Sequence, residues 1–163
     1  MSTPPVPSQT RIFYLPDSAA TEAAGAWLAQ HGLAGSLIYL QGDLGAGKTT
    51  LVRGFLRALG HQGAVKSPTY TLVETYTLAT VPRRLVYHVD LYRLSDAEEL
   101  EYLGFRDYFD GASWCLVEWP ERGAGWLPPA DLRLTLDYEE SGRRLTVQAV
   151  NPSYFPVLQN GSL

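Results

Sequence analysis

The sequence predicts an α/β fold in which a mixed sheet is flanked by helices and extended by a C-terminal β-hairpin. Apolar strand patterns alternate with helical patterns, and a late pair of alternating segments surrounds residues 139–142. With 163 residues, of which 45% are hydrophobic, the chain is long enough for one buried core and too short for several domains. We expect a disordered tail over residues 1–10, one domain over 11–150 and a loose C-terminal tail over 151–163.

The first half of the chain reads as strand, helix, strand, turn and helix. A short strand is expected at 11–15, and a helix that Asp17 or Ser18 can cap is expected to reach about residue 30 and stop at Gly32. The continuous apolar run at 36–41 is typical of a buried parallel strand. A helix after the glycine-rich turn ends at Gly60 and has one apolar face, formed by Leu51, Val52, Phe55, Leu56 and Leu59.

The second half predicts two strands at 70–78 and 85–92, antiparallel neighbours on either side of a turn at Pro82. Ser95 and Glu98 have the spacing of a capping box, which predicts a helix over 96–103 that stops at Gly104. Residues 114–117 form another buried strand. A long Gly- and Pro-rich connection at 122–129 precedes the terminal hairpin.

One segment fits a phosphate-binding pattern. Residues 42–49 read Gly42-Asp43-Leu44-Gly45-Ala46-Gly47-Lys48-Thr49, which matches G-x-x-x-x-G-K-[ST] between a strand and a helix. Glycines let backbone N–H groups turn toward a polyphosphate, and the helix N-terminus adds a positive dipole. Lys48 is expected at the β- and γ-phosphates and Thr49 at Mg²⁺. The pattern predicts a P-loop NTPase-like sheet; the alternative is a plain glycine turn joining strand to helix.

Two acids follow apolar strands and are candidates for completing such a site. Glu118 follows 114–117, and Asp90 ends the strand at 85–89. We assign Glu118 to the metal and Asp90 to positioning or activating the attacking water, and the reverse assignment remains open. The structural alternative for each acid is a surface salt bridge.

The segment Lys66-Ser67-Pro68-Thr69-Tyr70 lies where nucleotide switches keep the residues that sense the γ-phosphate. Thr69 is a candidate ligand of Mg²⁺ or water, and a plain β-turn containing Pro68 is the alternative. His88, on the strand before Asp90, is interpreted as a packed core histidine in preference to a base.

Charge and cysteine content narrow the classes of partner. Thirteen basic and 17 acidic residues give a net charge of −4, which argues against a protein that binds DNA or RNA over its whole surface. The single cysteine, Cys115, excludes an intramolecular disulfide, and the apolar runs are too short to span a membrane. Because 1–10 also lacks the features of a targeting segment, we expect a cytoplasmic protein with no membrane and no DNA partner.

Four motifs in order carry a family resemblance. With the P-loop in place, the chain continues with Ser67-Pro68-Thr69, then His88-Val-Asp90-Leu-Tyr92-Arg93, then Glu118-Trp119-Pro120. From about residue 15 to 150 it closely resembles the TsaE family, formerly YjeE, of bacterial ATPases. The resemblance implies that 11–150 is a P-loop ATPase domain with weak activity alone, which associates with the TsaB and TsaD proteins. It also implies that ATP hydrolysis resets that complex between rounds of threonylcarbamoyl transfer to tRNA, so tRNA is contacted only indirectly.

The same resemblance implies roles for single residues. Lys48, Thr49 and Thr50 contact the phosphates of ATP, Thr49 and Glu118 bind Mg²⁺, and Asp90 and Trp119 are needed for activity. Asp17 lies in a Leu-Pro-Asp segment like that of the family and is expected to line the nucleotide site. Two other functions remain open: a small-molecule kinase that uses the same loop, and a scaffold that is gated by nucleotide binding alone.

Overall fold

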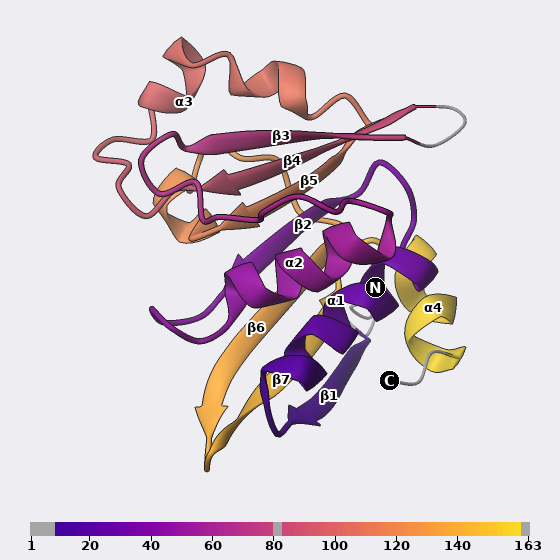
Figure 1. The fold of residues 1–163 in the computed structure, drawn as a ribbon. Helices are drawn as coiled ribbons and strands as arrows, with labels where there is room; N and C mark the ends of the chain where they lie inside the picture. Colours follow the sequence, from indigo (N-terminus) through magenta and orange to yellow (C-terminus); the bar gives the residue numbers. More distant parts are fainter. Residues whose placement is uncertain (1–8, 80–82, 161–163) are drawn as a thin grey trace, which may run out of the picture.

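The computed structural model describes residues 9–79 and 83–160. A seven-stranded mixed sheet with flanking helices confirms the predicted α/β class, and the strand order is β1-β7-β6-β2-β5-β4-β3 (Figure 1). Residues 1–8 of the tail expected at 1–10 and the turn expected at Pro82 lie outside the described residues, whereas Thr10 belongs to the first strand. The strands are β1 Thr10–Leu15, β2 Leu37–Gln41, β3 Val73–Leu78, β4 Arg84–Asp90, β5 Trp114–Glu118, β6 Leu132–Glu139 and β7 Gly142–Ala149.

The middle of the sheet is parallel and determines where polar side chains can collect. Strands β6, β2, β5 and β4 run parallel, whereas β1, β7 and β3 are added in antiparallel pairs. Glu118 pairs in register with Leu40 on one side and Asp90 on the other. Because parallel strands end at the same edge, the two acids lie beside each other, next to the loop that follows β2.

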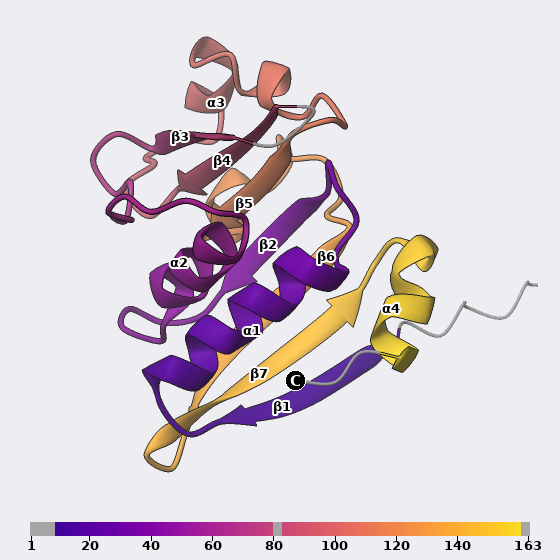
Figure 2. The same ribbon diagram turned by 45° about the vertical axis from the view of Figure 1, so that its right-hand side comes forward.

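Helices α1 (Ser18–His31) and α2 (Lys48–Ala58) lie side by side on one face of the sheet (Figure 2). Glycines allow their close approach: a Cβ on Gly25 would lie 2.0 Å from the Leu51 carbonyl oxygen, and one on Gly54 would lie 2.0 Å from that of Glu22. As predicted, Asp17 caps α1, because its side chain accepts the Ala20 N–H at 2.8 Å. This packing fixes the N-terminus of α2 against the sheet.

The opposite face is covered by short helices, and here one prediction is wrong. A single turn, α3 (Glu99–Tyr102), and the 3₁₀ helix η1 (Phe105–Tyr108) replace the helix expected over 96–103. The capping box does not form, since the Glu98 N–H donates to the Asp96 carboxylate at 2.9 Å. That local side-chain turn competes with helix initiation and shortens the helix.

The C-terminal segment is also different from the loose tail that the sequence predicted. Residues 152–160 form the 3₁₀ helix η3 (Pro152–Tyr154) and helix α4 (Phe155–Asn160). Tyr154 and Leu158 are buried in the core, and the Tyr154 hydroxyl accepts the Leu33 N–H at 2.8 Å. Two buried anchors in a stretch of this length are too few for periodicity to reveal, but they dock it against the core.

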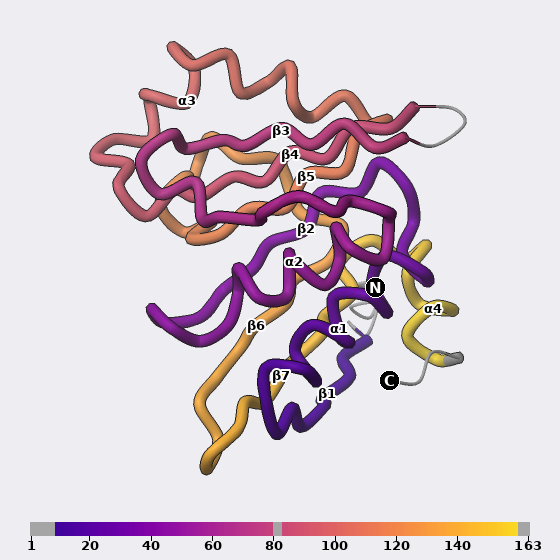
Figure 3. The backbone as a smooth tube through the Cα atoms, viewed as in Figure 1, coloured from indigo at the N-terminus to yellow at the C-terminus, as the bar shows by residue number. Residues whose placement is uncertain are grey.

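The connection from α2 to β3 returns along the sheet to its carboxyl edge (Figure 3). Strand β3 begins at Val73 and not at residue 70, because the Leu72 N–H bonds the Pro68 carbonyl at 2.7 Å and Leu72 has a left-handed φ of 68°. This turn keeps 67–70 out of the sheet and beside the ends of β4 and β5. In the described part of the chain, no helix has the length and apolar character needed to cross a membrane.

Candidate nucleotide site

The glycine-rich loop occupies six residues between the end of β2 at Gln41 and the start of α2 at Lys48. Gly47 caps the helix with a φ of 111°, and a Cβ on Gly42 would lie 2.7 Å from the Leu136 carbonyl oxygen. Both positions therefore require glycine. The first N–H groups of α2 have no intrahelical acceptor and face the end of the sheet, which is the geometry of an anion site.

The terminal hairpin braces this loop from outside. Tyr138 and Arg143, which pair in register across β6 and β7, contact three successive carbonyls of the loop. The Tyr138 hydroxyl donates to Leu44 at 2.7 Å, and the Arg143 guanidinium donates to Gly45 at 3.2 Å and to Ala46 at 3.0 Å. Neither residue was predicted from the sequence. Strand alternation indicates that they share a face, but nothing local reveals that the P-loop lies against them.

Lys48 is buried at the start of α2, with 5% of its surface exposed. Its ammonium donates to the Gly42 carbonyl and lies 4.0 Å from the centre of the Trp119 ring. Burial lowers the pKa of Lys48, while the nearby Glu118 and Asp90 carboxylates oppose that shift. A cation in this position is already desolvated and is directed to the pocket that the two acids line.

Glu118 ends β5 with only 3% of its surface exposed. The Thr49 hydroxyl donates to its Oε2 at 3.3 Å, and Nε2 of His88 lies 2.6 Å from the same oxygen. Trp119, the next residue, has a left-handed φ of 56°, an uncommon conformation for a bulky side chain. This local turn places the indole over Lys48 while the carboxylate stays at the strand end.

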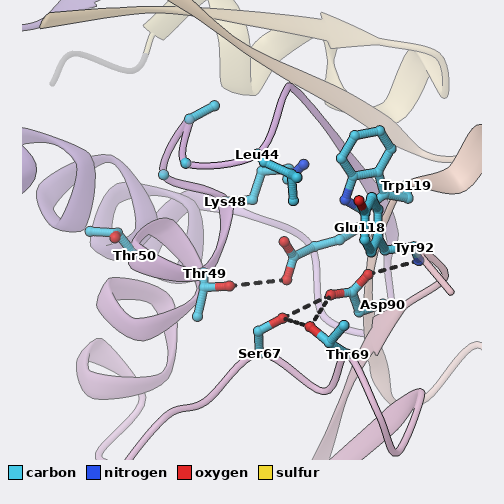
Figure 4. A pocket seen from close by; sticks show the side chains of 13 residues that line it. Leu44, Lys48, Thr49, Thr50, Ser67, Thr69, Asp90, Tyr92, Glu118 and Trp119 are labelled. Atoms are coloured by element: carbon cyan, nitrogen blue, oxygen red, sulfur yellow. Dashed lines mark hydrogen bonds between the residues drawn. The ribbon is translucent and has the colours of Figure 1, made fainter.

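Asp90 ends β4 and is equally buried, but it is held by other partners (Figure 4). Its Oδ2 accepts from the hydroxyls of Ser67 at 2.8 Å and Thr69 at 3.2 Å. Its Oδ1 accepts the Tyr92 N–H at 2.9 Å. The 67–69 segment is thus tied to the end of β4 through one carboxylate.

These side chains surround one pocket of about 370 Å³. Most residues predicted from the sequence line it: Leu44, Gly45, Ala46, Gly47, Lys48, Thr49, Thr50, Thr69, Asp90, Glu118 and Trp119. Ser67 and Tyr92 also line it, although the sequence did not single them out. The signal for Ser67 was its place in the motif beside Thr69.

Two predicted residues lie elsewhere. Asp43 supports the loop from within, since its carbonyl accepts the Ala46 N–H at 3.1 Å. Asp17 lines a neighbouring pocket of about 300 Å³ on the other side of the P-loop, together with Thr21 and Arg143. The two pockets share Gly45, Ala46, Gly47 and Thr50, so both border the same stretch of backbone.

The donor set at the pocket is compatible with Mg²⁺. This ion prefers oxygen ligands and is usually held by one or two side chains together with substrate phosphates. Thr49 and Glu118 supply such a pair of oxygen donors on facing elements. Among residues 9–79 and 83–160, no group of three or more His, Cys, Asp or Glu side chains forms a self-sufficient metal site. A magnesium site here would therefore depend on oxygens from the nucleotide.

Comparisons with known proteins agree with this architecture. Residues 15–146 match the family described as threonylcarbamoyl adenosine biosynthesis protein TsaE. The tRNA threonylcarbamoyladenosine biosynthesis protein TsaE of Haemophilus influenzae is 57% identical over 113 residues, which are 69% of this chain and 70% of that protein. The protein of the same name from Synechocystis is 49% identical over 114 residues, covering 68% and 70%.

A solved structure is similar in fold as well. The crystal structure of YdiB from Bacillus subtilis has a TM-score of 0.79 and 29% sequence identity, and the match covers 94% of this chain and 95% of that one. The resemblance noted from four short motifs thus extends over most of the sequence and over the whole fold. The chain belongs to the TsaE family of threonylcarbamoyl adenosine biosynthesis proteins.

Proposed function

We propose that this protein is a Mg²⁺-dependent ATPase that acts in tRNA threonylcarbamoyladenosine synthesis. We further propose that it associates with TsaB and TsaD, that its hydrolysis of ATP resets their complex, and that it meets tRNA only through them. One observation supports the proposal above all others. Four groups with the chemistry of phosphoryl transfer, namely Lys48, Thr49, Asp90 and Glu118, line one pocket beside a helix N-terminus.

The residues of the P-loop would bind and orient the triphosphate. The free N–H groups at the start of α2 can donate hydrogen bonds to anionic oxygens, and Lys48 can leave the Gly42 carbonyl to contact the β- and γ-phosphates. Thr49 and Glu118 would hold Mg²⁺. When bound, Mg²⁺ neutralises charge that develops on the phosphate oxygens.

Asp90 is suited to the attacking water. Its carboxylate lies at the end of β4, beside Glu118, and is oriented by the hydroxyls of Ser67 and Thr69. Those contacts place an acceptor at the pocket wall and leave the carboxylate in reach of a water molecule in the pocket. We assign to Asp90 the positioning of this water and the acceptance of its proton.

Phosphate release from ATP tests the proposal directly. Purified protein is expected to release phosphate slowly with Mg²⁺ and ATP, and faster when TsaB and TsaD are added. Lys48→Ala and Lys48→Arg serve as paired controls, because the planar guanidinium does not replace a compact ammonium in a tight anion nest. Both variants are expected to lose the activity.

Two results would overturn this function. The first is transfer of a labelled γ-phosphate to a metabolite, which would make the protein a kinase. The second is normal tRNA modification by Asp90→Asn protein that has lost hydrolysis, which would make it a nucleotide-gated scaffold.

A further inference from the structure

We propose that His88 is a positioning residue that orients the Glu118 carboxylate for Mg²⁺. This inference rests on the proposed function and assigns a role to a residue that sequence reasoning interpreted as core packing. His88 lies on β4 with no exposed surface, and its Nε2 is 2.6 Å from Oε2 of Glu118. It is two residues before Asp90 and pairs in register with Leu116, two residues before Glu118, so it lies directly behind the pair of acids.

The environment of His88 determines which nitrogen carries the proton. Within the described parts of the chain, the buried Nδ1 has no hydrogen-bond partner. A neutral ring with its proton on Nδ1 would place the Nε2 lone pair against a carboxylate oxygen 2.6 Å away and would also leave a buried donor unpaired. The geometry therefore requires an Nε2–H that donates to Glu118. Among the described residues, the ring bonds one polar partner, Glu118, which a residue kept for packing alone does not need.

This hydrogen bond gives the two carboxylate oxygens of Glu118 different roles. Among residues 9–79 and 83–160, the side-chain hydrogen bonds of Glu118, from His88 and Thr49, both end on Oε2. Figure 4 shows the other carboxylate oxygen on the side of the pocket where Lys48 lies. His88 thus holds Oε2 from behind and keeps the second oxygen facing the pocket. A donor fixed to a metal-binding carboxylate in this way typically changes metal affinity by about 10–100-fold.

Three substitutions of His88 distinguish a role in positioning Glu118 from a role in core packing. The side-chain nitrogen of glutamine can occupy the place of Nε2, so His88→Gln keeps the donor. In His88→Asn the amide reaches only the level of Nδ1, and in His88→Leu the donor is absent. Val86→Ala is the matched packing control, because Val86 is buried on the same strand two residues earlier and has no part in the site.

The measurement is the affinity for ADP by calorimetry, with and without Mg²⁺, together with Mn²⁺ binding to the ADP complex by electron paramagnetic resonance. We expect His88→Leu and His88→Asn to weaken metal binding by about tenfold while metal-free ADP affinity is unchanged. His88→Gln is expected to stay within about threefold of the wild type. Val86→Ala is expected to lower the melting temperature without changing metal affinity.

The inference is overturned if His88→Asn and His88→Gln bind the metal equally well, or if metal affinity falls in Val86→Ala as it does in the His88 variants. The comparison of glutamine with asparagine holds even where the leucine variant does not fold. Absence of ATP hydrolysis by the wild type would overturn the proposed function and leave the metal-binding result for His88 to be judged by itself.

Discussion

The ends of β4 and β5 carry two acids that are equally buried but have different hydrogen-bond partners. Asp90 and Glu118 face each other in register, and each is 3% exposed. Asp90 accepts hydroxyl hydrogen bonds from the 67–69 segment and the Tyr92 N–H, whereas Glu118 is bonded by the first turn of α2 and by the interior of β4. Neighbouring carboxylates in one pocket are therefore held by two different parts of the molecule.

The two attachments differ in how easily they can change. Ser67 is exposed, and the turn at Leu72 separates its segment from the sheet, so the hydroxyl contacts to Asp90 come from a turn outside the sheet. The partners of Glu118 are fixed by the packing of α2 and by a strand without exposed surface at His88. This difference favours Glu118 for a metal that must stay in place and Asp90 for a group that responds to the γ-phosphate.

The largest effect is expected when Glu118, the acid whose partners are held by core packing, is replaced. Glu118→Ala should reduce hydrolysis by about 100-fold or more, since a bound metal stabilises the transition state by several kcal/mol. It should also abolish the Mg²⁺-dependent part of nucleotide affinity, as measured by calorimetry. Glu118→Gln is the control, because its amide oxygen can still accept the hydrogen bond from His88. A Glu118→Ala protein with the rate and Mg²⁺ dependence of the wild type would refute the metal assignment.

The next largest effect is expected when Asp90, the acid held by the 67–69 segment, is replaced. Asp90→Asn should lower the rate of phosphate release by about 100-fold, within the range that positioned bases contribute. The affinity of this variant for nucleotide with Mg²⁺ should remain within about threefold of the wild type, because Glu118 and its partners are unchanged. The opposite pattern, with metal affinity lost in Asp90→Asn and kept in Glu118→Gln, would exchange the roles of the two acids.

The smallest effects are expected in the segment that holds Asp90. Ser67→Ala and Thr69→Val should each slow phosphate release by about 3–10-fold, the equivalent of one hydrogen bond that water can partly replace. Tyr70→Phe is the matched control in the same segment: it removes only the exposed hydroxyl that accepts from Arg93 at 3.2 Å. We expect it to change the rate by no more than about twofold. Equal losses in all three variants would show that the segment acts as a whole and not through Asp90.

Much of the fold was predictable because its signals are local. The apolar run that became β2, the Asp17 cap of α1 and the alternation that became the β6–β7 hairpin each depend on neighbouring residues. The predictions failed where another side chain competed with a local pattern, or where a segment had too few apolar residues to form a pattern. Asp96 competed with the expected capping box, and the isolated anchors Tyr154 and Leu158 docked a segment that its composition marked as loose.

By itself, the sequence determined the chemistry of the candidate site. The P-loop pattern and acids at strand ends require only residue type and spacing, and Lys48, Thr49, Asp90 and Glu118 were identified in that way. The tertiary structure decided how those groups are held. The bond from His88 to Glu118 and the brace from Tyr138 and Arg143 join residues about 30 and about 100 positions apart. No local pattern encodes such contacts, because strand order and register bring them together only after the sheet has formed.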